Sequence, residues 1–131
     1  MPSIQIDLPL RLPPAEKQQL AQRVGEIYGE IMQVGKDLLT VSVHDLGEGG
    51  VWRCHDGAPP TPSALIMCDI RSGRPVPTRA RLAQALIDAC VELFALDALW
   101  VKVEFTQHAG DEMYHPHLAG FNTDWTGDER R

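Results

Sequence analysis

The sequence predicts an α/β (α+β) fold in which one strand–helix–strand unit occurs twice. Apolar patterns of period two and period 3.6 alternate in the order strand, helix, strand, and this order then repeats. Short sequence matches also recur between the two halves at an offset of 60 to 62 residues, which is typical of an internal duplication. We therefore expect residues 1–131 to form a single domain with halves at about 2–45 and 62–106, followed by a tail.

The first half begins with a strand and a helix. Residues 3–8 alternate apolar and polar side chains, the pattern of a strand with one buried face. Pro13 and Pro14 then open a helix, since proline is favoured in the first helical turn. Apolar residues recur at helical spacing to about residue 33, and a second alternating segment follows at 39–44.

The second half repeats this order. The apolar segment 64–70 predicts a central strand, Pro77 lies in the first turn of a second helix, and residues 101–105 alternate as a fourth strand. Between the halves, residues 46–62 hold four glycines and three prolines, which predicts a loop or an irregular hairpin. The matches between the halves are Pro2-Ser3 with Pro62-Ser63, Arg11 with Arg71, and Leu20-Ala21-Gln22 with Leu82-Ala83-Gln84.

The repeated unit also predicts how the layers are arranged. A strand–helix–strand unit of this length needs a right-handed crossover and gives a parallel strand pair. Two units then give a four-stranded sheet with both helices on one face. No segment remains to cover the other face, so we expect oligomerisation to bury it.

Composition limits the classes of partner. The net charge of −6 argues against non-specific nucleic-acid binding, which needs an excess of Lys and Arg. No apolar run reaches the roughly 18 residues of a membrane span, and no secretory signal is visible, so we expect a cytoplasmic protein. Three cysteines without close pairing do not indicate a disulfide framework.

Pro2 is the first candidate for chemistry. Methionine before a small residue is normally removed, so we expect the mature chain to begin with Pro2. Its nitrogen would then be a secondary amine, and an α-amino group titrates at about 7.7–8.0 before burial or a nearby arginine lowers that value. Such an amine can act as a general base or acid. Alternatively, Met-Pro is simply a common way for a chain to begin.

Together, Pro2 at the start of a strand, the duplicated unit and the chain length resemble the tautomerase superfamily. This group includes 4-oxalocrotonate tautomerase, macrophage migration inhibitory factor, malonate semialdehyde decarboxylase and the cis-3-chloroacrylic acid dehalogenases. The resemblance implies a homotrimer with a barrel-like arrangement, in which the sheets are enclosed at the centre and the helices lie outside.

The segment Arg71-Ser-Gly-Arg74 is similar to an Arg-x-Gly-Arg motif of the dehalogenases and to an arginine pair of the decarboxylase. The resemblance implies that Arg71 and Arg74 bind a substrate carboxylate beside Pro2. Two guanidinium groups next to a helix amino terminus also favour an anion on physical grounds. The alternative is a solvated basic face shared with Arg79 and Arg81.

Three further residues have two interpretations each. Tyr28 stands where the dehalogenases carry a histidine, but it also lies on the apolar stripe of its helix. Asp37 lies near the sequence position of the catalytic aspartate of the decarboxylase, or it is a turn residue before a strand. Glu112 lies roughly where the dehalogenases place a water-activating glutamate, in a stretch of irregular spacing. Lys102 replaces a dehalogenase tyrosine, and this departure, like Tyr28, puts a dehalogenase assignment in doubt.

We expect no metal and no cofactor. The spacing of Cys54-His55, His108 and His115-Pro116-His117 fits no standard zinc pattern, and no glycine-rich phosphate loop is present. The segment 122–128 is weakly similar to the carboxyl terminus of the decarboxylase.

These observations predict an enzyme that tautomerises a 2-oxo or unsaturated carboxylate. Arg71 and Arg74 hold the substrate, and Pro2 moves the proton. One alternative is a hydratase, dehalogenase or decarboxylase of a three-carbon acid that uses the same pocket. Another is a non-catalytic trimeric binding module, which would not need the Pro2 amine.

Overall fold

The computed structural model describes residues 2–122 of the chain. Met1 and residues 123–131, which include most of the segment that resembles the decarboxylase terminus, lie outside the described residues. The first half contains β1 (Ser3–Leu8), α1 (Pro14–Met32) and β2 (Thr40–Asp45). The second half contains β5 (Ala64–Arg71), α2 (Val76–Phe94), the 3-10 turn η1 (Ala98–Trp100) and β6 (Val101–His108). A hairpin of β3 (Trp52–His55) and β4 (Ala58–Pro62) separates them.

The two long helices begin and end in the same way. Each has 19 residues, with an extended proline as the N-cap, Pro13 for α1 and Pro75 for α2, and a second proline in the first turn. Proline fits there because the first helical N–H groups have no partner within the helix. Each helix ends at a residue in the left-handed region, Gln33 with φ 53° and Ala95 with φ 54°.

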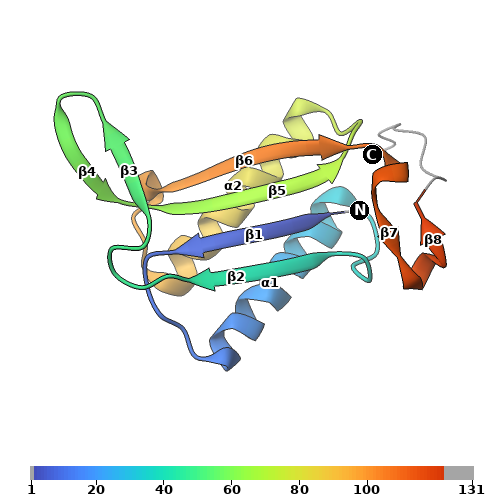
Figure 1. Cartoon of the computed structure of the whole chain (residues 1–131), viewed down its shortest axis with the longest axis horizontal. Coiled ribbons are helices and arrows are strands. Elements are labelled where there is room, and N and C mark those ends of the chain that lie inside the picture. The colour runs from blue at the N-terminus through green and yellow to red at the C-terminus, as the bar shows by residue number, and fades with distance from the viewer. Residues whose placement is uncertain (1, 123–131) are drawn as a thin grey trace.

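The four long strands form one sheet in the order β2-β1-β5-β6. Within each half the two strands are parallel, whereas the central pair β1 and β5 is antiparallel. Figure 1 shows both helices on one face of this sheet, as predicted. The fold class predicted from the sequence is therefore confirmed.

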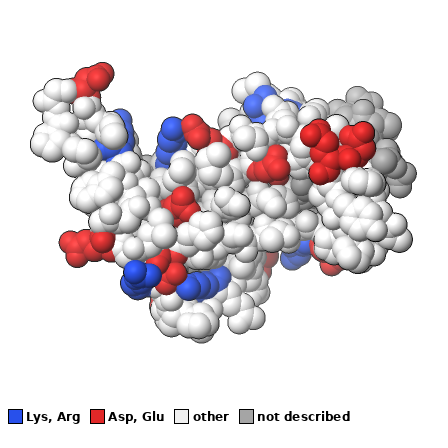
Figure 2. All heavy atoms as spheres, in the orientation of Figure 1, with Lys and Arg blue, Asp and Glu red and all other residues white. Residues whose placement is uncertain are grey.

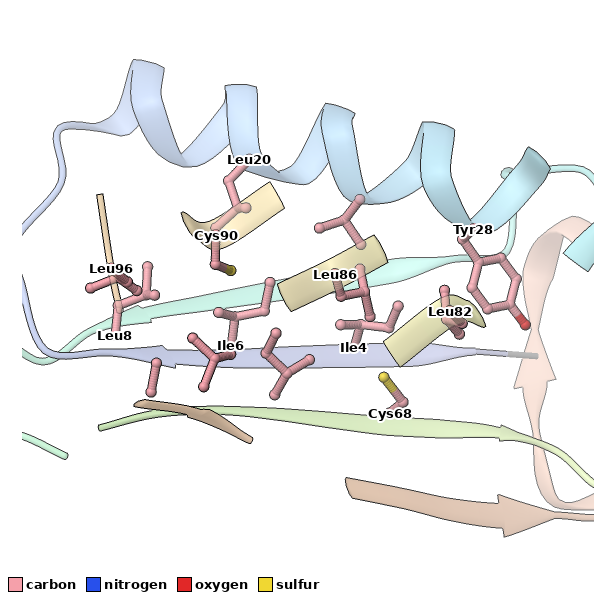
Figure 3. Close-up of a cluster of buried hydrophobic side chains, with 14 of the residues drawn as sticks. Ile4, Ile6, Leu8, Leu20, Tyr28, Cys68, Leu82, Leu86, Cys90 and Leu96 are labelled. Atoms are coloured by element: carbon pink, nitrogen blue, oxygen red, sulfur yellow. The ribbon is translucent and has the colours of Figure 1, made fainter. Parts of the chain in front are cut away.

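The core lies between the sheet and the two helices. Alternate residues of the central strands, such as Ile4, Ile6 and Ile66, are fully buried there. They meet the apolar stripes of the helices, represented by Leu20 on α1 and Leu86 on α2, as Figure 3 shows. Burying side chains of this size stabilises the fold by about 1.5–3 kcal/mol each.

The opposite face of the sheet is open and largely polar. On this face Gln5 of β1 and Glu104 of β6 are exposed, whereas Met67 of β5, which pairs with both, is half-buried. Lys102 and Glu104 form an ion pair there, with 2.9 Å between Nζ and Oε1. Figure 2 shows acidic and basic residues scattered among neutral ones over this side of the molecule. No helix in the described part of the chain is long and apolar enough to span a membrane.

The sequence predicted a loop or an irregular hairpin for residues 46–62, and the structure shows the hairpin of β3 and β4. All five residues of β4 are exposed, and three of them are prolines. A strand without a buried face has no period-two apolar pattern, and proline is restricted to edge strands, so the two strands were not evident from the sequence. The hairpin projects from the end of the sheet opposite the amino terminus (Figure 1).

Candidate active site

The antiparallel pairing of β1 with β5 brings the amino terminus to the end of β5. Ser3 pairs with Asp69, so Pro2 lies next to the last residues of β5. Pro2 is buried, and its carbonyl oxygen accepts a hydrogen bond of 3.3 Å from the Thr40 N–H of β2. The position of Pro2 is therefore set by strands on both sides.

A cavity of about 430 Å³ opens at this end of the sheet. This volume is within the usual range for sites that bind small molecules. It is bounded by the start of β1, the carboxy-terminal end of α1, the β5–α2 turn and the tail. The lining residues are Pro2, Tyr28, Val34, Gly35, Asp37, Leu38, Arg71, Arg74, His117, Leu118 and Asn122. Of the six site residues predicted from the sequence, the structure brings five together here, and Glu112 is the exception.

Arg71 is the last residue of β5, and only 8% of it is exposed. Its Nη2 donates a hydrogen bond to the main-chain carbonyl of Asn122 in the tail. Gly110 lies against both groups, and a Cβ at that position would overlap the guanidinium and the Asn122 carbonyl. The close approach of the tail to Arg71 therefore requires glycine at position 110.

Arg74 joins the cavity to the end of the first helix. It is 7% exposed, and its Nη1 donates a hydrogen bond of 3.0 Å to the carbonyl oxygen of Met32, the last residue of α1. A cation is favoured there because the last carbonyl groups of a helix carry a partial negative charge and have no partner within the helix. Arg74 also directly precedes Pro75, the N-cap of α2, where the helix dipole favours an anion.

Tyr28 is both a core residue of α1 and a residue of the cavity wall, so both interpretations of its place in the sequence apply. The residue is 3% exposed and belongs to the core, but it also lines the cavity. In Figure 3 its hydroxyl group points out of the cluster of apolar side chains. A phenol placed in this way can donate a hydrogen bond to a carbonyl or carboxylate group.

The two predicted acidic residues differ in position. Asp37 lies in the connection between α1 and β2 and lines the cavity. Glu112 is not among the described residues that line it. Its Oε1 accepts a hydrogen bond of 2.8 Å from the Ala109 N–H, which caps the 3-10 turn η2 (Gly110–Glu112). In this structure Glu112 therefore stabilises a turn of the tail.

The tail contributes residues whose place in the cavity the sequence did not predict. After β6 it forms η2, a short pair of strands, β7 (Tyr114–His115) and β8 (Gly120–Phe121), and between them the 3-10 turn η3 (Pro116–Leu118). His117 and Leu118 of η3 line the cavity. The tail has no apolar period, and a proline between two histidines was the one local feature that marked this turn.

A second cavity, of about 690 Å³, lies at the opposite end of the sheet, beside the β3–β4 hairpin and η1. It contains none of the predicted site residues, and its walls include the exposed side chains Trp52 and Leu99. Among residues 2–122, no group of three or more His, Cys, Asp or Glu side chains is arranged to hold a metal ion.

No protein-family model matches the sequence, and no curated protein matches it either. Solved structures do resemble the fold. The protein Pt0534, in a structure of the form inactivated by 2-oxo-3-pentynoate, is 19% identical, with a TM-score of 0.74 over 92% of this chain and 94% of its own.

Two further structures extend the likeness. FG41 malonate semialdehyde decarboxylase inhibited by 3-bromopropiolate is 15% identical, with a TM-score of 0.69 over 84% of this chain and 86% of its own. The R7 fused 4-OT, described as an asymmetric trimer, is 14% identical, with a TM-score of 0.70 over 83% of this chain and 88% of its own. The decarboxylase and 4-OT are named members of the superfamily that the sequence resembles. The chain therefore has the fold of the tautomerase superfamily.

Proposed function

We propose that this chain is an enzyme in which Pro2, once Met1 has been removed, serves as general base or acid for keto–enol tautomerisation of a 2-oxo or unsaturated carboxylate. The observation that carries the proposal is that Pro2 lines one cavity with Arg71 and Arg74. A secondary amine beside two cationic side chains is suited to move a proton on a bound anion.

The guanidinium groups have two tasks in this mechanism. Arg71 and Arg74 bind the carboxylate, and they stabilise the negative charge that develops on the enolate oxygen. Burial and nearby cations also disfavour the protonated form of an amine, which leaves Pro2 neutral and able to accept a proton. Neutral Pro2 takes a proton from the α-carbon or the enol oxygen and returns it to the other position.

Two other residues complete the proposed site. The hydroxyl of Tyr28 donates a hydrogen bond to a substrate oxygen, since it points out of the core at the cavity. Asp37 lies on the wall of this cavity, in the α1–β2 connection. We propose no part for Glu112 in substrate binding or catalysis, because its carboxylate accepts the hydrogen bond that caps η2.

The first experiment compares ketonisation of phenylenolpyruvate by the Met1-free protein and by its Pro2→Ala variant. We expect a rate well above the uncatalysed one, and a fall of about 10²-fold or more in the variant. Intact mass establishes that Met1 is absent. A third sample, with an amino-terminal extension that is not removed, keeps every side chain but turns the Pro2 nitrogen into an amide. We expect this form to be inactive.

The outcomes separate the candidate functions. Equal activity in the extended form and the Met1-free form would contradict a role for the amine. No activity in any sample would contradict tautomerisation and would direct the test to three-carbon halo- and oxo-acids. A chain that is inactive toward these acids as well, but binds them with Pro2→Ala unchanged, would be a binding module.

Decarboxylation is the second candidate, and the position of Asp37 favours it. Asp37 shares the cavity with Pro2, Arg71 and Arg74, and it lies near the position of the decarboxylase's catalytic aspartate in the sequence. Incubation with malonate semialdehyde tests this candidate directly. Release of carbon dioxide that is lost in both Pro2→Ala and Asp37→Asn would establish the decarboxylase, whereas release at the uncatalysed rate would exclude it.

We propose further that three copies of the chain assemble. The open face of the sheet supports this, and so does the trimer described for the similar fused 4-OT. The polar residues of the open face indicate an interface with many hydrogen bonds. Light scattering should give three times the chain mass of 14.5 kDa, and a mass of 14.5 kDa at micromolar concentration would contradict the proposal.

A further inference from the structure

The tail places a histidine in the cavity that contains Pro2. His117 is the second residue of η3, and it lines the cavity beside Leu118. No other imidazole is found among the described residues that line this cavity. Histidine can both donate and accept a proton near neutral pH. An imidazole in the same cavity as the proposed Pro2 amine could therefore take part in proton transfer.

The main chain holds His117 in a defined position. Its N–H donates a hydrogen bond of 2.9 Å to Nδ1 of His115, and Pro116 restricts φ in the first position of the turn. The turn is closed by a hydrogen bond of 2.9 Å from the Ala119 N–H to the Pro116 carbonyl, with Ala119 in the left-handed region at φ 55°. The imidazole therefore extends from a fixed backbone.

The tail is in turn fastened to the body of the fold at the same end of the sheet. Where the tail leaves the sheet, both the N–H and the hydroxyl of Ser72 donate to the carbonyl of His108, the last residue of β6, at 2.8 and 3.1 Å. Within the tail, the Asn122 N–H donates to the Met113 carbonyl at 3.2 Å, and the Asn122 carbonyl accepts from Arg71. Figure 1 shows β7 and β8 beside the amino terminus. These contacts hold η3 at the mouth of the cavity.

Asp37 faces His117 across this mouth. The distance between His117 Nε2 and Asp37 Oδ2 is 3.9 Å, and both side chains are in contact with solvent, at 55% and 83% exposure. A carboxylate at this distance attracts a protonated imidazole electrostatically. The other charged or titratable groups lining the cavity come from the region around β1, α1 and β5–α2: Tyr28, Arg71, Arg74 and, once Met1 is removed, the Pro2 amine.

We propose that His117 is a second proton-transfer group of this site and that Asp37 is the residue that positions it. The inference rests on the proposed function, which it deepens by assigning a partner to Pro2. Pro2 exchanges a proton with the substrate carbon next to the carbonyl carbon, and His117 exchanges one with the carbonyl or enol oxygen. The amine then does not have to serve both atoms.

The steps balance as follows for a 2-oxo acid. The Pro2 nitrogen takes a proton from the carbon next to the 2-oxo carbon, and the electron pair of that C–H bond forms the carbon–carbon double bond. The carbonyl π pair moves to oxygen, which receives the Nε2 proton of the His117 imidazolium. In the reverse direction protonated Pro2 gives its proton to carbon and neutral His117 takes the enol proton. The exposed His117 returns to its starting form by proton exchange with water, and Pro2 does so through the cavity that it lines after the product has left.

The test uses His117→Ala in the Met1-free protein. We expect kcat to fall by about 10²-fold with KM within about threefold of wild type, since a lost acid or base affects the transition state more than binding. Added imidazole should raise the kcat of the variant by at least about tenfold, because removal of the exposed side chain leaves an open space at the mouth of the cavity. A residue that only supported the tail would not be replaced by a small molecule.

The matched control is His115→Asn. This histidine belongs to the same tail but does not line the cavity, and the asparagine oxygen can still accept the His117 N–H. We expect its activity to be within threefold of wild type and insensitive to imidazole. Both variants should melt within about 2 °C of wild type, because neither removes a buried group.

Asp37 is tested through its dependence on His117. Asp37→Asn should lower kcat by about tenfold in the wild-type background and by less than twofold when His117 is already alanine, because a positioning residue acts only through its partner. Asp37→Glu should recover part of the loss. Additive losses, or no recovery by glutamate, would overturn the assignment of Asp37.

Two results would overturn the role of His117: activity of His117→Ala within threefold of wild type, or a loss that imidazole does not restore in a protein that melts normally. Either would leave the proposed function standing if Pro2→Ala is inactive. If the wild-type protein or its Pro2→Ala variant fails the comparison described above, the proposed function itself fails. The two failures are therefore distinguishable.

Discussion

Replacement of Arg74 by methionine is expected to reduce stability and activity together. Methionine keeps much of the buried volume but removes the hydrogen bond of 3.0 Å from Nη1 to the Met32 carbonyl at the end of α1. A hydrogen bond to a charged group contributes about 1.5–3 kcal/mol, and a buried carbonyl without a partner is costly, so we expect the free energy of unfolding to fall by about 2 kcal/mol. For a chain of this length that corresponds to a melting temperature lower by roughly 6–10 °C.

The same change should weaken the proposed carboxylate site. Loss of one charge-assisted hydrogen bond to substrate, at about 2–3 kcal/mol, lowers kcat/KM by roughly 30- to 150-fold. Thermal unfolding and phenylenolpyruvate ketonisation on the same preparation measure both effects. Arg81→Met is the matched control, because Arg81 is an exposed residue of α2, and we expect it to change stability by less than about 0.5 kcal/mol.

The structural role and the substrate-binding role of Arg74 can be tested separately. If Arg74→Met melts at the same temperature as Arg81→Met, the contact with the end of α1 contributes nothing to stability. If Arg74→Met is less stable but keeps the wild-type kcat/KM, Arg74 is a structural cation and does not bind substrate. Arg74→Lys keeps the charge without the planar fork, and its kcat/KM should be intermediate.

Two other predictions concern groups away from the cavity. Burial raises the pKa of the Cys68 thiol to about 12 and that of the Cys90 thiol to about 11, whereas Cys54 is exposed. A thiol reagent at pH 8 should therefore modify only Cys54 in the native protein, as counted by mass spectrometry, and modification of the other two would show that the core opens. A hydrogen bond from Lys17 is the main cause that holds the pKa of Asp45 below the usual value of an aspartate side chain. A lowered pKa in the folded state stabilises the fold at pH values above the pKa that Asp45 has in the unfolded state. This stabilisation is lost as the pH falls through the folded-state pKa of Asp45. The Lys17→Met variant should therefore be less stable than wild type in urea at pH 6 but not at pH 2. An equal difference at both pH values would contradict the ion pair.

The helices and central strands were predictable because their signals are local. The predicted helix from Pro13 and Pro14 to about residue 33 is found at Pro14–Met32, since proline at its start and a one-sided apolar stripe are properties of the segment itself. The exposed β4, with its three prolines, has no such signal, and the sequence could say no more than loop or irregular hairpin.

The candidate site was only partly predictable. Pro2, Arg71 and Arg74 were identified through the resemblance to a family and through the chemistry of an amine beside two cations. The position of Glu112 at a capped turn, and that of His117 at the mouth of the cavity, depend on how the tail folds back. Neither position follows from the local pattern, because the tail has no apolar period.

The sequence by itself determined the order of the elements, the buried face of each helix and central strand, and the duplication matches at an offset of 60 to 62 residues. These features follow from side-chain periodicity, which is encoded within a few residues. The tertiary structure alone decided that the two halves join through an antiparallel pair, β1 with β5, which places Pro2 beside the end of β5. It also decided that the tail lies over Arg71. Pairing between strands some 60 residues apart, and docking of an aperiodic tail, depend on contacts between distant segments that no local window of sequence contains.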